Sequence, residues 1–170
     1  MRAEQRPKVQ SFDPIIGPAP KLLILGSMPG VASLQAAQYY AHPRNRFWPL
    51  LEALLQQPLP QAFDDRYDWL RAQGIALWDV LAECRRQGSL DSAIGARDLR
   101  INPIAELLQQ HPSIRLVATN GGLAAQLYRR HIWPQTQNTP WLQLPSTSPA
   151  NARLRLEDLV AAWSPIQGAF

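Results

Sequence analysis

The sequence predicts an α/β fold of three layers, with helices on both faces of a four-stranded and mainly parallel sheet. Three observations lead to this prediction: short apolar runs are bounded by glycine, proline or polar residues, amphipathic segments lie between these runs, and the two kinds alternate along the chain. Strands that alternate with helices usually become parallel neighbours, because each helix returns the chain to the same end of the sheet.

Four apolar runs are interpreted as the strands. Each contains four or five residues, which is a usual length for a strand buried on both faces. The first run follows a segment rich in proline and glycine and stops at Gly26, and the last is followed by a loop rich in serine and proline. The predicted strands are residues 21–25, 75–78, 115–119 and 141–144.

The helices are predicted where apolar residues recur at spacings of three and four. Pro58 ends the first of them, and Gly74 lies at the boundary of the second. Asn102 followed by Pro103 is a favourable helix start, with an amide cap and proline in the first turn. The predicted helices are residues 45–56, 65–73, 102–110, about 122–130 and about 152–163.

Length and composition indicate one domain. The 170 residues fit a single domain, which we assign to residues 21–170, preceded by a polar arm and entry loop over residues 1–20. A hydrophobic fraction of 46% argues against disorder, and neither a membrane-spanning run nor a secretory signal is present. A soluble, cytoplasmic monomer is therefore expected. One cysteine and three histidines predict neither a disulfide framework nor a metal site.

The charge balance permits a nucleic-acid partner without identifying one. Seventeen basic residues stand against thirteen acidic ones, so the formal net charge is +4, and fifteen of the basic residues are arginine. A small positive charge that is spread evenly over a surface affects solubility more than recognition. A DNA or RNA partner must therefore be argued from local motifs.

Polar or glycine-rich segments follow three of the predicted strands: residues 26–30, Asp79 and residues 144–151. Because parallel strands end at the same edge of a sheet, we expect these segments to converge there and to form a site. The segment 26–30, Gly-Ser-Met-Pro-Gly, has neither the glycine pattern of dinucleotide-binding loops nor the Gly-Lys-Ser/Thr of P-loops. No nucleotide cofactor is therefore predicted, and taken alone this segment is equally consistent with an ordinary loop.

The segment 38–48 is rich in side chains that suit nucleic acid. It holds four aromatic residues, two arginines, a histidine and an asparagine. The ring of Tyr40 can stack on a nucleobase, and Arg44 and Arg46 can contact phosphates. Asn45 can orient a water molecule or a base edge, or it can cap the helix that follows.

The segment 144–151, Leu-Pro-Ser-Thr-Ser-Pro-Ala-Asn, is stiffened by two prolines. Its three hydroxyl groups and its backbone N–H groups can hold a phosphate. The alternative is an ordinary capped entry to the last helix.

Taken together, residues 26–30, 39–48 and 144–151 resemble the uracil-DNA glycosylase superfamily and, more narrowly, its hypoxanthine-DNA (deoxyinosine) glycosylase branch. The resemblance implies an enzyme without metal or cofactor that flips a deaminated base out of damaged DNA and hydrolyses its N-glycosidic bond. Hypoxanthine is the first candidate base, with uracil or xanthine as further ones. Residues 41–48 also resemble the mismatch-specific uracil-DNA glycosylases, which are an alternative. A non-catalytic nucleic-acid-binding member of the fold is another.

The resemblance also implies roles in catalysis. Many superfamily members position the attacking water with an Asp or Asn where this chain has Met28, so a carboxylate base is excluded at that point. The candidate catalytic residues are instead Asn45, which would position the water, and Ser27. Tyr40 would stack on the flipped base, and the backbone amides of Ser27 and Met28 would contact its edge. Several branches have a donor to the departing base where this chain has Leu144.

Asp79 and His42 complete the residues expected at the base. Asp79 is expected to accept N1–H or N3–H as a carboxylate, or alternatively to cap a helix that begins at Val80. His42 can replace the donor that the chain lacks at Leu144. The loop that follows Leu144 is expected to press into the minor groove. The residues expected to bind DNA are Gly30, Arg44, Arg46, Ser146, Thr147, Ser148, Pro149, Asn151 and Arg153.

Overall fold

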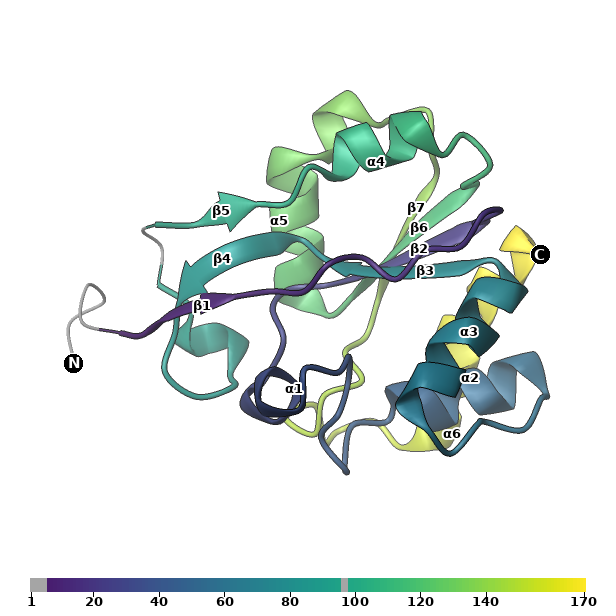
Figure 1. The fold of residues 1–170 in the computed structure, drawn as a ribbon, viewed down its shortest axis with the longest axis horizontal. Coiled ribbons are helices and arrows are strands. Elements are labelled where there is room, and N and C mark those ends of the chain that lie inside the picture. The colour runs from purple at the N-terminus through teal and green to yellow at the C-terminus, as the bar shows by residue number, and fades with distance from the viewer. Residues whose placement is uncertain (1–5, 96–97) are drawn as a thin grey trace.

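A four-stranded sheet forms the centre of the computed structural model, which describes residues 6–95 and 98–170 (Figure 1). Its strand order is β3-β2-β6-β7, and every neighbouring pair is parallel. The predicted α/β class and the four-stranded parallel sheet are confirmed, and each strand lies within one residue of its predicted range. The strands are β2 (Leu22–Gly26), β3 (Ile75–Asp79), β6 (Leu116–Asn120) and β7 (Trp141–Leu144).

Helices cover both faces of this sheet, so the fold has three layers. In Figure 1, α4 and α5 lie on one side of the sheet, and α2, α3 and α6 lie on the other. The helix α1, which was not predicted, follows the loop after β2. The helices are α1 (Val31–Ala36), α2 (Phe47–Leu55), α3 (Phe63–Gln73), α4 (Ile104–Gln110), α5 (Gly122–His131) and α6 (Leu156–Trp163). The described residues also contain the 3₁₀ helices η2 (Asp91–Ala93), η3 (Trp133–Gln135) and η4 (Ser164–Ala169).

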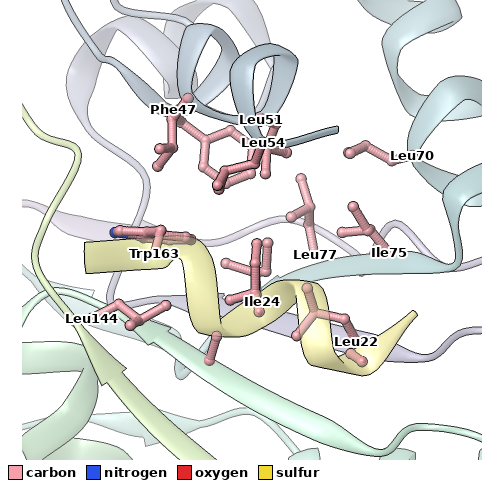
Figure 2. Packing of buried hydrophobic residues seen from close by; sticks show 14 of the residues in the cluster. Leu22, Ile24, Phe47, Leu51, Leu54, Leu70, Ile75, Leu77, Leu144 and Trp163 are labelled. Atoms are coloured by element: carbon pink, nitrogen blue, oxygen red, sulfur yellow. The ribbon is translucent and has the colours of Figure 1, made fainter. Parts of the chain in front are cut away.

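The apolar strand β2 divides its side chains between two cores. Leu22 and Ile24 pack in the cluster that contains α2 and α6, which Figure 2 shows around Phe47 and Trp163. Leu23 packs in the cluster on the other face, with side chains of α4 and α5. This alternation follows from the two-residue period of a strand. Full burial of each aliphatic side chain contributes about 1.5–3 kcal/mol, so β2 is held firmly.

A second, antiparallel sheet was not predicted. It has the order β1-β4-β5 and consists of β1 (Lys8–Gln10), β4 (Leu81–Arg85) and β5 (Arg100–Ile101). Only Val80 separates β3 from β4, so no helix begins there and Asp79 does not cap one, which corrects that alternative. The Val80 N–H donates to the carbonyl of Gly26 (2.8 Å), and Asn102 N–H donates to Val80 O (2.9 Å). These bonds join Val80 to the end of β2 on one side and to the residue that follows β5 on the other.

Asn102 does not cap α4, contrary to the prediction. The helix begins at Ile104, with Pro103 as its N-cap residue. The Asn102 amide instead donates to the carbonyls of Asp79 (2.8 Å) and Leu81 (3.2 Å). Since these carbonyls lie where the chain leaves β3, the amide fixes the position of Asp79.

The described part of the predicted arm contacts the rest of the fold, whereas residues 1–5 of that arm lie outside the described residues. Strand β1 pairs with β4, and Ile15 forms an isolated bridge with Leu77. Lys8 and Glu83 make an ion pair of 2.6 Å across β1 and β4. In the described ranges, no helix has the length and apolar character that crossing a membrane requires.

Candidate active site

A cavity of about 650 Å³ lies where β2, β3 and β6 end, between the loop after β2 and the loop after β7. It brings together nearly all of the predicted site residues. Arg46 and Arg153 are the two that do not line it. The lining residues are 26–30, 32, 33, 39, 40, 42, 44, 45, 79, 89–91, 120 and 146–151.

Gly26 leaves the space that the Asp79 side chain occupies. The two residues are paired in register at the ends of β2 and β3. A Cβ atom on Gly26 would lie 2.5 Å from Asp79 Oδ1 and 3.2 Å from the Tyr40 hydroxyl. The absence of a side chain on Gly26 therefore leaves room beside it for the Asp79 carboxyl and the Tyr40 hydroxyl, and all three residues line the cavity.

The Asp79 carboxyl is buried without full hydrogen bonding. The residue is 4% exposed, and its Oδ2 atom bonds to no residue that the structure describes. The pKa of Asp79 is raised from 3.8 to about 7, mainly because burial disfavours the charged form; the Asp91 charge adds to this rise and the Arg86 charge opposes it. A neutral carboxyl is therefore available near pH 7, and it both donates and accepts a hydrogen bond. This changes the expectation of a carboxylate that only accepts.

Tyr40 is held in an uncommon backbone conformation, with a φ of 53°. One face of its ring stacks on Phe47, with centroids 3.9 Å apart and planes 21° apart. Its hydroxyl accepts a hydrogen bond from Asn120 Nδ2 (3.3 Å). Positive φ in a bulky residue is costly and is concentrated at functional sites. The packing thus fixes Tyr40 in the wall of the cavity.

The side-chain oxygen of Asn45 accepts a hydrogen bond from the first residue of α2. Its Oδ1 accepts from the Phe47 N–H (3.0 Å), although the N-cap residue itself is Arg46. Among the described residues, Asn45 Nδ2 has no hydrogen-bond partner, and Asn45 lines the cavity. The two readings of Asn45 are therefore compatible. His42 accepts from the Arg44 N–H at Nδ1 (3.1 Å), which leaves Nε2 as its second polar atom.

Ser27 is held by a residue that sequence reasoning missed. Its hydroxyl donates to Asp91 Oδ1 (2.6 Å), and the neighbouring Ser89 hydroxyl accepts from the Val31 N–H (2.8 Å). These bonds attach the segment with η2 to the first loop. No local pattern marks Ser89 and Asp91, because the contacts join residues about 60 positions apart in the chain.

Asn120 was not among the predicted site residues, although Asp79 was predicted from the same feature, a polar residue at the end of an apolar strand. It is the polar end of a buried strand, β6. Its Oδ1 accepts from the Thr147 N–H (3.0 Å), and its Nδ2 donates to Thr147 Oγ1 (3.0 Å). Asn120 thus joins the third strand end to the loop after β7 and to Tyr40.

Two residues predicted to bind DNA support the loop after β7 from inside. Thr147 is fully buried, so its side chain is not presented to a ligand in this structure. The Arg46 guanidinium donates to the carbonyls of Ser148 (3.1 Å), Asn151 (2.9 Å) and Leu154. Arg46 and Thr147 thus make hydrogen bonds within the protein, and their expected contacts with DNA stay predictions.

The remaining loop residues stay available at the rim. Gly30, Ser146, Ser148, Pro149 and Asn151 are partly exposed. Arg44 and Arg153 are exposed at the two segments that border the cavity. Positive charge at a cavity rim is suited to phosphate groups.

Met28 and Leu144 are packing residues. Met28 is 7% exposed and belongs to the core that contains α4 and α5, although it also lines the cavity. Leu144 belongs to the core on the other face, as Figure 2 shows. Within the described ranges, no cluster of three or more His, Cys, Asp or Glu residues is arranged to hold a metal ion.

Comparisons with known proteins agree with this geometry. The family model described as the uracil DNA glycosylase superfamily matches residues 14–167. A protein of Methanosarcina barkeri named hypoxanthine DNA glycosylase is 38% identical over 115 residues, covering 67% of this chain and 72% of the relative. A protein of the same name from Methanosarcina acetivorans is 34% identical over 145 residues, covering 85% of this chain and 89% of the relative.

A solved structure shares the fold over almost the whole chain. It is a solution NMR structure from Methanosarcina acetivorans described as a candidate uracil DNA glycosylase. Its TM-score is 0.78 at 30% sequence identity, and the match covers 95% of this chain and 99% of that one. With the family model spanning the four-stranded sheet and every loop of the cavity, the chain belongs to the uracil DNA glycosylase superfamily.

Proposed function

We propose that this DNA glycosylase removes hypoxanthine from DNA and leaves an abasic site, which initiates base excision repair. The observation that carries the proposal is the buried carboxyl of Asp79, a residue that lines the cavity and whose Oδ2 has no hydrogen-bond partner among the described residues. The names of the two Methanosarcina relatives support the same base.

Hypoxanthine presents an N1–H donor beside an O6 acceptor on one edge. A neutral Asp79 carboxyl complements both atoms, because its carbonyl accepts and its hydroxyl donates. An ionised Asp79 accepts N1–H alone and would repel the N1 lone pair of adenine. The neutral carboxyl can also pair with N1 and N6–H of adenine, so discrimination against adenine comes from the ionised form. Since a pKa of about 7 makes the neutral form available at neutral pH, Asp79 suits the lactam edge of a deaminated purine.

The flipped base would lie against Tyr40. Phe47 covers one face of the Tyr40 ring, and we place the base against the other face. Stacking of this kind contributes about 1–3 kcal/mol per base. The exposed Arg44 and Arg153 would contact the phosphates that flank the flipped nucleotide.

Asn45 and Ser27 would position the attacking water. In the reaction the C1′–N9 bond breaks and its electron pair leaves with the base. The water oxygen forms a bond to C1′, the water gives up one proton, and the base gains one. A neutral amide suffices when the bond to the base breaks first, because the cationic sugar then attracts the water oxygen. His42 would contact the base from the same segment as Asn45.

The test is excision from a duplex with a single deoxyinosine, followed by alkaline cleavage of abasic sites. We expect strand scission at inosine and none at adenine in the same position. Asn45→Ala should lower single-turnover excision by about 100-fold or more while DNA affinity is retained. Asn138→Ala is the matched control, because Asn138 is exposed and does not line the cavity.

Other outcomes identify the alternatives. Binding without scission at excess enzyme would refute the enzymatic proposal and indicate a non-catalytic nucleic-acid binder. Scission confined to G·U pairs would indicate the mismatch-specific uracil activity instead. A panel with inosine, uracil and xanthine therefore tests the choice of base directly.

A further inference from the structure

Arg86 is a buried cation behind the first wall of the cavity, and no step described above uses it. It follows β4 and is 1% exposed. Its Nη2 donates to the carbonyl of Pro29 in the loop after β2. Its Nε and Nη1 hydrogen-bond to no residue in the described part of the chain. A buried guanidinium with two unpaired nitrogens is unfavourable for stability, so stability does not explain its presence.

The charges that act on Arg86 belong to the site. Asp91 and Asp79, which both line the cavity, favour its charged form, and Arg86 in turn lowers the pKa of Asp79. Burial also raises the pKa of Asp91, whereas the Ser27 hydroxyl and Arg86 lower it. Each of the two carboxyls that ionises places one negative charge opposite the single cation. Cys84 also favours the charged form of Arg86, and Asp79 in turn raises the pKa values of Tyr39 and Tyr40. Burial is the main cause of the raised pKa of these three groups.

The net charge of Arg86, Asp79 and Asp91 affects the departing base, because the base carries away the electron pair of the glycosidic bond. At Met28 and Leu144 the chain has apolar side chains that donate no hydrogen bond to the base. A fixed positive charge in a water-poor site stabilises a developing anion more strongly than it would in water. Ionisation of both Asp79 and Asp91 would make this side of the cavity net negative and would oppose departure of the base for the same reason.

We propose that Arg86 is a positioning residue for base excision, which holds the loop over residues 26–30 through the Pro29 carbonyl and supplies the positive charge that allows the base to leave as an anion. The inference rests on the proposed function. Because Arg86 does not line the cavity, it acts through the loop and through its electric field.

The test compares Arg86→Gln and Arg86→Lys with the wild type in the full chain. Single-turnover excision of hypoxanthine is measured across a range of pH. Affinity is measured with a duplex that contains 2′-fluoro-deoxyinosine, which resists cleavage. Arg130→Gln on α5 is the control, because that arginine is exposed and makes no contact with the cavity.

We expect Arg86→Gln to lower excision by about 10- to 100-fold while affinity for the uncleaved duplex stays at the wild-type value. Wild-type activity should fall as Asp79 ionises. Removing the positive charge favours neutral Asp79, so the midpoint of this fall should move to higher pH in Arg86→Gln. Arg86→Lys retains the charge and should keep the wild-type midpoint.

Several results would overturn the inference. Excision by Arg86→Gln at the wild-type rate would overturn it. So would slower excision in which the midpoint of the pH profile is unchanged and affinity for the uncleaved duplex is weakened as much as the rate. If Arg86→Gln does not fold, a shifted midpoint in Arg86→Lys would refute the electrostatic role. A wild-type protein that does not excise hypoxanthine refutes the proposed function, whereas an active wild type with an equally active Arg86→Gln refutes only the role of Arg86.

Discussion

Gly26→Ala tests whether the close approach of Asp79 to β2 forms the base-binding end of the cavity. The new Cβ would lie 2.5 Å from Asp79 Oδ1, 3.2 Å from the Tyr40 hydroxyl and 3.7 Å from Asp79 Cγ. Ordinary contact begins at 3.4 Å, so Oδ1 must retreat by 3.4 − 2.5 = 0.9 Å. Asp79 is 4% exposed, and its own carbonyl is held by Asn102, so little room exists for this movement.

The magnitude follows from this displacement. Overpacking of a buried position costs about 1–3 kcal/mol, which corresponds to a fall in Tm of roughly 2–12 °C for a domain of this size. A catalytic or binding group that is misplaced by about 1 Å lowers the rate by about 100-fold. We therefore expect Gly26→Ala to remain folded, to melt earlier, and to excise hypoxanthine about 100 times more slowly than the wild type.

The assay combines thermal unfolding with single-turnover excision from a deoxyinosine duplex. Gly122→Ala, at the first position of α5, is the control, because a Cβ there meets no atom within 4 Å. Alanine at this helical position should be neutral or stabilising by up to about 1 kcal/mol. If Gly26→Ala were as stable and as active as Gly122→Ala, the role assigned to the contact between Gly26 and Asp79 would be refuted.

Three further perturbations test the site. The pKa of Asp79 is raised from 3.8 to about 7 in the folded protein, so its stabilising contribution is present in acid and is lost as pH rises through 7. Relative to Asp79→Asn, the wild-type free energy of unfolding, measured by urea denaturation, should therefore fall by about 4 kcal/mol between about pH 4 and about pH 9. Parallel curves of unfolding free energy against pH for the two proteins would contradict the shift. Arg44→Gln combined with Arg153→Gln should reduce the salt dependence of DNA binding by about one unit of slope per lost phosphate contact, and an unchanged slope would remove these arginines from the interface. Asn120→Ala leaves the Thr147 N–H without its acceptor and should destabilise the protein by about 1–3 kcal/mol in the same denaturation assay, whereas an effect near zero would show that Arg46 alone holds the loop.

The strands, and hence the position of the site, were predictable from local sequence. Within the predicted strand at residues 21–25, residues 22–25 are all apolar and are followed by Gly26, which is typical of a buried strand. Because parallel strands end at one edge, the loops that follow them had to meet there. The second sheet was not predictable in this way, since β1 and β4 pair across about 75 residues of chain and each is short.

The chemistry of individual side chains was decided by tertiary structure. Asp79 could be placed at a strand end from the sequence, but its protonation depends on burial and on Asp91 and Arg86, which the fold brings to it. Arg46 is basic in any conformation, yet three carbonyls of the loop after β7 use its guanidinium. The sequence by itself determined the fold class, the loops that form the cavity and the family resemblance, because short-range patterns carry that information. Only the tertiary structure decided which groups in those loops face a ligand and which charge they carry, because desolvation and hydrogen bonding depend on residues that are distant in the chain.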